Sequence, residues 1–171
     1  FERPEEKEEF GALQFIGTSA AILRLTNIRE IEEMYQSCEI QVSTRVNKVG
    51  MVKGYFRIPY DGTDRFAFKA EVRNMPMHTL NSTLHPLAGV LVHSGNLVRL
   101  DFTMEAAGSG AQSHLILDYE DLKLDIMSRR DKRSGLTWLA NPLLRTTNLP
   151  DQKNYRIGKY TVQRNVHRGP F

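Results

Sequence analysis

The sequence contains a single cysteine, lacks a long apolar run and carries little net charge. Cys38 alone excludes an intrachain disulfide and a thiolate metal cluster. A helix that crosses a bilayer needs about 20 consecutive apolar residues, and no segment reaches that length. No signal peptide is evident. Lys and Arg total 23 against 20 Asp and Glu, and this net charge of +3 is too small to predict a nucleic-acid partner.

Catalytic and cofactor motifs are also missing. The sequence has no HExxH pair, no glycine-rich phosphate loop and no nucleophile elbow, and its five histidines lack metal-ligand spacing. The acidic run from Asp118 to Asp125 lacks the glycine and terminal glutamate of a calcium loop, so we interpret it as a solvated strand edge. We therefore expect no cofactor, no metal and no enzymatic activity.

Alternation of apolar and polar residues is the clearest positive signal. Cys38, Ile40, Val42, Thr44 and Val46 point one way in the segment 37–46, and polar residues point the other way. The segments 52–60 and 66–72 repeat this pattern. Turn residues at 47–50 and the dipeptide at 61–62 separate the three segments. The pattern predicts three consecutive antiparallel strands.

The flanking segments yield further predictions. Residues 10–25 predict a strand or a bent pair, and 28–35 a short helix with a capping box formed by Asn27 and Glu30. Leucine and methionine spacing over 77–87 indicates helical turns that Pro86 interrupts. Ser94 to Asn96 resembles a hairpin turn between strands at 90–92 and 98–104.

The C-terminal part continues the β pattern. A long strand over 112–127 changes the parity of its apolar positions near Asp121, which predicts a bulge. A polar loop at 128–135, a short amphipathic helix at 136–144 and a last strand at 155–164 complete the chain.

The sequence thus predicts a mainly β fold, an antiparallel, curved or groove-like sheet of about seven or eight strands with two or three short helices. We expect residues 1–9 to form a disordered lead-in and 10–171 a single domain. Because the chain begins with Phe1 rather than methionine, we expect it to be the C-terminal fragment of a longer protein.

The apolar sheet face is the candidate binding surface. It is expected to consist of Phe56, Ile58, Phe66, Phe68, Leu100 and Phe102. A closed core and an open groove impose the same alternation, so both interpretations stay open. A basic loop is the candidate contact for anionic lipid headgroups, with an ordinary exposed turn as the alternative; it consists of Arg129, Arg130, Lys132 and Arg133.

Three segments, MPMHTLNSTLHPLAGV, SGNLVRLDFTMEA and LILDYEDLKLDIM, resemble the C-terminal region of AsmA-like proteins of the Gram-negative cell envelope, in particular the long versions of Bacteroidetes-type bacteria. The tail NPLLRTTNLPDQKNYRIGKYTVQRN is similar to them too. The resemblance covers roughly the last hundred residues well and the earlier part by strand pattern only.

This resemblance implies a non-catalytic periplasmic domain of a protein anchored in the inner membrane through its N-terminal part. It also implies a role in outer-membrane biogenesis, with phospholipid bound or moved along an apolar β groove. The alternative is a structural or partner-docking envelope domain with a closed core and no ligand.

Overall fold

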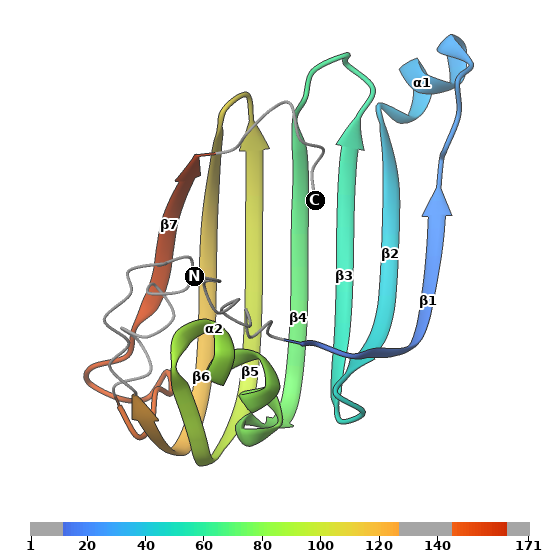
Figure 1. The fold of residues 1–171 in the computed structure, drawn as a ribbon. Helices are drawn as coiled ribbons and strands as arrows, with labels where there is room; N and C mark the ends of the chain where they lie inside the picture. Colours follow the sequence, from blue (N-terminus) through green and yellow to red (C-terminus); the bar gives the residue numbers. More distant parts are fainter. Residues whose placement is uncertain (1–11, 127–144, 164–171) are drawn as a thin grey trace, which may run out of the picture.

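The computed structural model describes residues 12–126 and 145–163, which form one open antiparallel sheet (Figure 1). The sheet has seven strands in the order β1-β2-β3-β4-β5-β6-β7, so every strand pairs with its neighbours in sequence. The strands are β1 (Phe15–Leu23), β2 (Ser37–Val46), β3 (Gly50–Pro59), β4 (Phe66–Pro76), β5 (Val90–Ala107), β6 (Gly110–Ile126) and β7 (Ile157–Gln163). The predicted β fold is confirmed.

The predicted alternation on β2, β3 and β4 is confirmed by the strand register. Ile40 lies opposite Phe56, and Phe56 lies opposite Phe68, so all three side chains share one face of the sheet. Polar residues such as Lys53 and Glu71 pair with each other on the other face. The connection between β3 and β4 spans 60–65 rather than the two residues that Asp61 and Gly62 alone would form.

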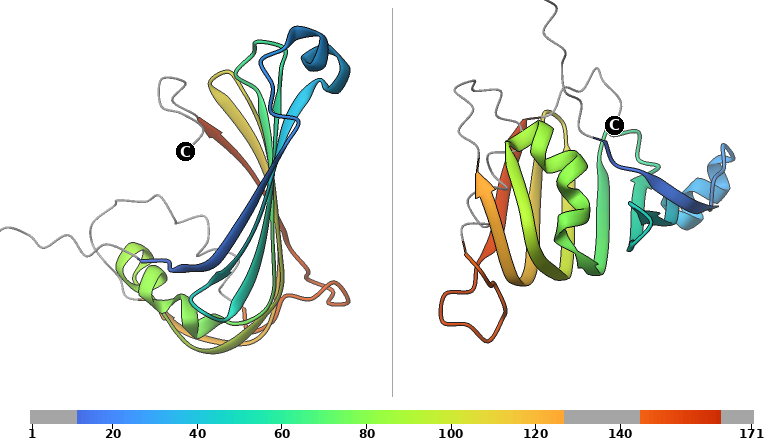
Figure 2. Two further views of the ribbon diagram at one scale, coloured as in Figure 1. Left: turned by 90° about the vertical axis from the view of Figure 1, so that its right-hand side faces the viewer. Right: turned by 60° about the horizontal axis from the view of Figure 1, so that its bottom comes forward.

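The sheet is strongly curved, as Figure 2 shows from its edge. Gly95 (φ 132°) and Asp121 (φ 53°) lie side by side, between the pairs Ser94↔Lys123 and Asn96↔Glu120, where the register shifts. Asn74 (φ 48°) lies nearby on β4. Bulges bend the strands that carry them. The bulge predicted near Asp121 is therefore confirmed.

The hairpin turn predicted at Ser94–Asn96 is wrong. These residues lie inside β5, which runs without a break to Ala107, and the hairpin between β5 and β6 is formed by Gly108 and Ser109. A positive-φ glycine serves a bulge as well as a turn, so the residue type alone misled the prediction.

Two short helices fill the lower part of the concave side, η1 (Met77–Leu80) and α2 (Asn81–Ala88) (Figure 1). Their buried residues Met77 and Leu84 join a core with sheet residues that include Leu97 and Tyr119. The Asn81 side chain donates to the carbonyl of Val92 and accepts from its N–H, both at 2.8 Å, which fixes α2 on β5. The apolar face of the sheet is therefore its concave face.

Pro86 does not stop the helical segment as predicted, because α2 continues through it to Ala88. A proline has no N–H for the carbonyl four residues earlier. That carbonyl, of Ser82, instead accepts a hydrogen bond of 3.0 Å from the N–H of Ala12. Residues 12–14 thereby cross from β1 to α2 and form a strap on the concave side (Figure 2).

The strap is fixed along its length. Asn47 donates its N–H to the carbonyl of Gln14 (2.8 Å), and its side chain accepts from the N–H of Gln14 (3.1 Å) and donates to the carbonyl of Thr79 (2.6 Å). The hydroxyls of Ser82 and Thr83 donate to the carbonyl of Ala12 at 2.9 and 2.8 Å. The strap and both helices close the lower end of the concave side.

Helix α1 (Arg29–Tyr35) confirms the predicted helix beyond the upper ends of β1 and β2, but the capping box is wrong. Its N-cap is Ile28, whose side chain cannot cap, and the hydroxyl of Thr26 accepts from the N–H of Ile28 at 3.1 Å. The box fails because the helix begins one residue later than Asn27 requires.

Candidate apolar groove on the concave face

An unbroken row of large apolar side chains crosses the upper part of the concave face. Strand pairing places Ile22 opposite Ile40, Ile40 opposite Phe56, Phe56 opposite Phe68, and Phe68 opposite Met104. With neighbouring strands about 4.8 Å apart, the row from β1 to β5 is about 19 Å wide. We call these residues the apolar row.

Below the apolar row lies a row of smaller side chains. Ala20, Val42, Gly54 and Ala70 are paired in turn across β1 to β4, and Phe102 follows on β5. A Cβ at Gly54 would lie 3.7 Å from the ring of Phe68, so the ring leans over β3 at this point. The row of smaller side chains, which we call the strip, is therefore recessed relative to the apolar row above it.

The aromatic residues of the two rows contact each other. The rings of Phe56 and Phe68 have centroids 4.4 Å apart, and those of Phe68 and Phe102 lie 6.0 Å apart. Both distances fall in the range in which aromatic pairs attract. The aromatic pairs hold this part of the sheet surface in one arrangement.

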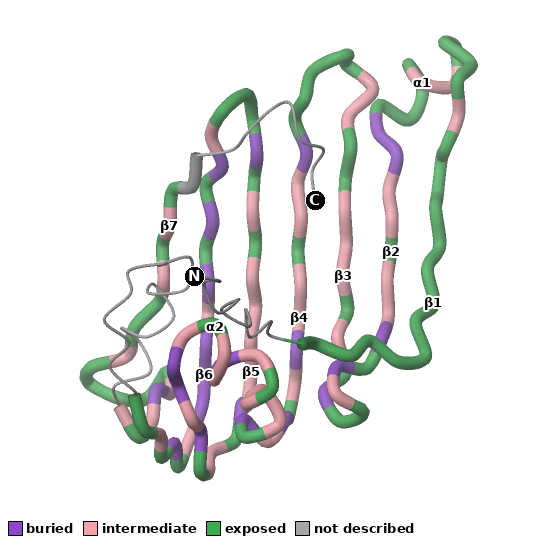
Figure 3. Tube along the Cα trace, viewed as in Figure 1, coloured by how far each residue is buried: buried purple, intermediate pink, exposed green. Residues whose placement is uncertain are grey.

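Exposure divides the six predicted binding residues. Ile58 is 38% exposed, and Phe56 and Phe68 are half-buried, whereas Phe66 is buried. Leu100 and Phe102 are partly buried and pack against the core that lies under the helices. Among the described residues, only η1 and α2 cover this face with helix, and β1 is exposed along its whole length (Figure 3).

Single-strand reasoning missed three residues of the apolar row, Ile22, Ile40 and Met104, as candidates for the site. Ile22 is 56% exposed on the edge strand. Only the cross-strand register places these residues beside Phe56 and Phe68, and the alternation pattern does not reveal that register. The four basic candidates Arg129, Arg130, Lys132 and Arg133 lie outside the described residues.

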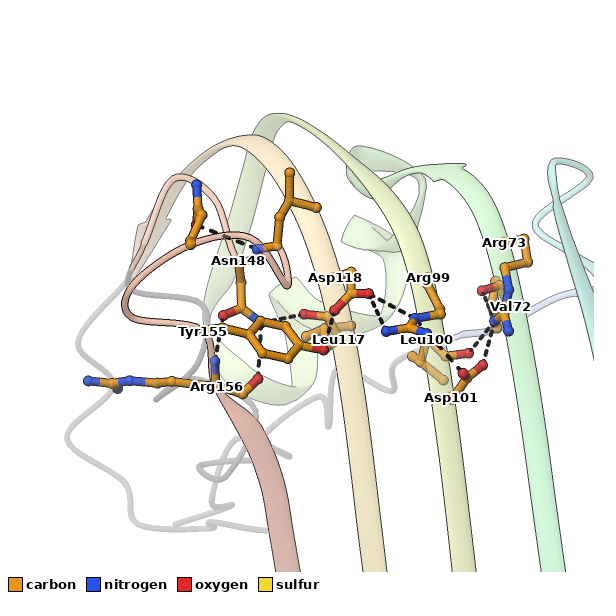
Figure 4. A network of polar contacts seen from close by, with 12 residues as sticks. Val72, Arg73, Arg99, Leu100, Asp101, Leu117, Asp118, Asn148, Tyr155 and Arg156 are labelled. Carbon is orange, nitrogen blue, oxygen red and sulfur yellow. Dashed lines mark hydrogen bonds and ion pairs between the residues drawn. The ribbon is translucent and has the colours of Figure 1, made fainter.

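The convex face carries a charged network rather than the solvated edge predicted for the acidic run (Figure 4). Arg99 donates from Nε and Nη2 to Asp118 Oδ2, both at 2.8 Å, and Asp118 is buried. Tyr155 Oη donates to Asp118 Oδ1 at 2.8 Å. Arg73 lies directly opposite Arg99, and Asp101 pairs with Arg73 at 2.5 Å. The two carboxylates offset the repulsion between the arginines.

The surroundings of Tyr155 disfavour ionisation of its phenol. Burial, followed by the hydrogen bond to Asp118, raises the pKa of Tyr155 above its usual value of 10.0. Asp121 and Asp125, by contrast, are exposed as predicted. The charged groups of this network pair with one another within the protein. We therefore assign the network a structural role, in which the bond from Tyr155 to Asp118 holds the segment 145–156 against β6.

A wide hollow of about 1390 Å³ lies at the upper end of the convex face, beside α1. Arginines and acidic residues line it together, and three of the arginines are paired there: Arg24 with Glu39 at 2.6 Å, Arg29 with Glu33 at 3.2 Å, and Arg65 with Asp61. Charges of both signs offset one another, so the hollow favours neither an anionic nor a cationic ligand.

Across residues 12–126 and 145–163, no group of three or more metal-ligating side chains occurs, and no helix is long and apolar enough to cross a membrane. No family model, curated protein or solved structure matches the chain.

Proposed function

We propose that this domain binds the acyl chains of phospholipid on the upper part of its concave face. The observation that supports the proposal best is the apolar row, which continues across five paired strands from Ile22 to Met104 with its β1 end exposed. Exposed apolar surface that is contiguous in this way is typical of interaction sites on soluble domains. The domain is non-catalytic in this proposal.

The energetics favour a chain-like apolar ligand. Each methylene that leaves water for an apolar surface contributes about 0.8 kcal/mol. Ten methylenes would therefore contribute about 8 kcal/mol before the cost of ordering the chain. The strip of small residues below the apolar row offers a shallow track in which the ligand can lie across the strands.

The resemblance to AsmA-like envelope proteins supports the same proposal and extends it. In this extension the domain faces the periplasm, its parent protein is anchored in the inner membrane, and its role belongs to outer-membrane biogenesis. Its partners are phospholipid or other envelope proteins.

The alternative is a structural or partner-docking envelope domain. A specific observation favours it: Phe66, Ala106 and Ala111 form a small buried cluster at the upper end of the face. In a purely structural domain, the apolar row would be core and no lipid would bind.

A matched pair of variants on β3 tests the proposal. Ile58 is 38% exposed on the concave face, and Met51 is 42% exposed on the convex face, opposite Arg45 and Arg73. Ile58→Glu should lower the amount of phospholipid that co-purifies with the domain, because a carboxylate beside Phe56 of the apolar row is not desolvated without cost. Met51→Glu should leave the amount of bound phospholipid unchanged.

The measurement is mass analysis of lipid extracted from each purified variant, with the denaturation midpoint of each variant measured in parallel. Equal lipid in both variants, or a wild-type domain free of lipid, would support the structural alternative instead.

A further inference from the structure

A second cavity lies at the β7 end of the sheet. It is a crevice of about 160 Å³ between β6, β7 and the segment 145–156, and its lining includes Leu115, Leu117, Asn148, Gly158 and Tyr160. β7 pairs with β6 only as far as Ile116. Beyond that point Asn148 takes the partner position through a bridge to Tyr119. The crevice lies where one partner of β6 replaces the other.

The side-chain amide of Asn148, which lines the crevice, is already fully hydrogen-bonded. Asn148 Nδ2 donates to the carbonyls of Leu117 (2.7 Å) and Arg156 (3.1 Å), and Asn148 Oδ1 accepts from the N–H of Arg156 (3.0 Å). An amide side chain has two donor hydrogens, and both are used. The leucine side chains supply apolar walls. The crevice therefore suits an apolar occupant better than a polar one.

Gly158 gives the crevice its shape. A Cβ at this position would lie 2.5 Å from the ring of Tyr160, which is closer than side chains approach one another. The end of the Tyr160 ring therefore occupies the space that a side chain at Gly158 would need, and the ring forms a wall of the crevice. Burial raises the pKa of the Tyr160 phenol above 10.0, in agreement with apolar surroundings.

The crevice lies on the same face of the sheet as the apolar row and the strip, beyond their β5 ends. Tyr160 lies opposite Ser113, and Ser113 lies opposite Met104, the last residue of the apolar row. Leu115 lies opposite Phe102 in the strip below. The strip and the crevice therefore lie in one line across the sheet, and Leu115, which is 3% exposed, lies between Phe102 and Gly158.

We propose that this crevice receives the methyl end of the bound acyl chain and thereby sets the chain length that the domain prefers. The inference rests on the proposed function. The volume is close to that of a cavity that holds one benzene ring, so about six carbons of a chain end fit into it.

The test compares binding of decanoic and hexadecanoic acid, measured by displacement of a fluorescent fatty acid from the intact domain. Leu117→Phe reduces the crevice, and Leu124→Phe is the matched control, since Leu124 lies on the same strand and packs against the same core without lining the crevice. Leu117→Phe should weaken the binding of hexadecanoic acid about tenfold, which is equivalent to roughly two methylenes left unburied. It should weaken the binding of decanoic acid less than about twofold. Leu124→Phe should not change the ratio of the two affinities.

Gly158→Ala is a second way to narrow the crevice, because its methyl group displaces the Tyr160 ring, and it should shift the ratio in the same direction. It replaces Leu117→Phe if that variant does not fold. Equal losses for the two acids would overturn the crevice inference and leave the proposed function intact. A wild-type domain that binds neither acid would overturn both.

Discussion

Replacement of Gly95 by alanine should destabilise the domain more than replacement of any other glycine considered below. Gly95 has a φ of 132°, a conformation that residues with a side chain rarely adopt. A Cβ there would lie 3.0 Å from Cα and 3.1 Å from Cδ1 of Leu122 on the paired strand. The added methyl group therefore meets both backbone strain and a backbone contact that cannot rotate away.

The expected cost is the sum of these two effects. Backbone strain of this kind costs about 1–3 kcal/mol, and overpacking against a fixed neighbour about 1–3 kcal/mol. We therefore expect Gly95→Ala to lower the free energy of unfolding by about 3 kcal/mol or more. Gly95→Asn should be no milder, because asparagine also has a Cβ and leaves the contact with Leu122 in place.

Two other glycines separate the effects. Gly108 has a φ of 54° and nothing within 4 Å of its Cβ position, so Gly108→Ala should cost only about 1 kcal/mol of left-handed strain. Gly54 has ordinary contacts at 3.7 Å and no positive φ, so Gly54→Ala should be neutral or stabilise the domain by about 0.5 kcal/mol.

Urea denaturation midpoints measure the series. With a slope of about 2 kcal/mol per M, Gly95→Ala should lower the midpoint by about 1.5 M. If Gly95→Ala costs no more than Gly108→Ala, β5 does not approach Leu122 this closely in solution. The bulge at Gly95 and Asp121 would then not be the origin of the bend.

Two further predictions concern charged groups. Asp118→Ala removes the buried acceptor of the network and leaves the Tyr155 hydroxyl without its partner, so the free energy of unfolding measured in urea should fall by about 2–4 kcal/mol. Asp125→Ala, at an exposed position, serves as the control. Equal losses in the two variants would contradict a structural role for the buried carboxylate of Asp118. Hydrogen bonds from the hydroxyl of Thr63 and from Arg65 lower the pKa of Asp61 from 3.8 to about 2. Its stabilisation is thus present above about pH 4 and lost as the pH falls towards 2, so the Tm of Asp61→Asn should fall less between pH 5 and pH 2 than that of the wild type. An unchanged fall would mean that these bonds do not form in solution.

The strands were predictable where one short segment contains the whole signal. The alternation on β2 and the parity change at Asp121 follow from side-chain geometry within a single strand, so both predictions are confirmed. The predictions of a turn at Ser94–Asn96 and of a helix stop at Pro86 were wrong because both depend on contacts with segments that are distant in sequence. β6 runs alongside Gly95, and Ala12 bonds the carbonyl that Pro86 leaves unpaired.

The candidate site was only partly predictable, for the same reason. Alternation indicates which residues share a face of one strand, but it does not indicate which residue on the next strand lies opposite. Ile22 and Met104 therefore join Phe68 only through the register. Asp118 looked solvated because its partners Arg99 and Tyr155 are distant in sequence.

The strap has a consequence for how the chain folds. All strand pairings join neighbours in sequence, so the sheet can grow one hairpin at a time with little loop-closure entropy. The bonds from Ser82 and Thr83 to Ala12 instead span 70 and 71 residues. The strap can therefore form its hydrogen bonds only after the sheet has formed and the helices have docked on it. This late step closes the lower end of the concave side.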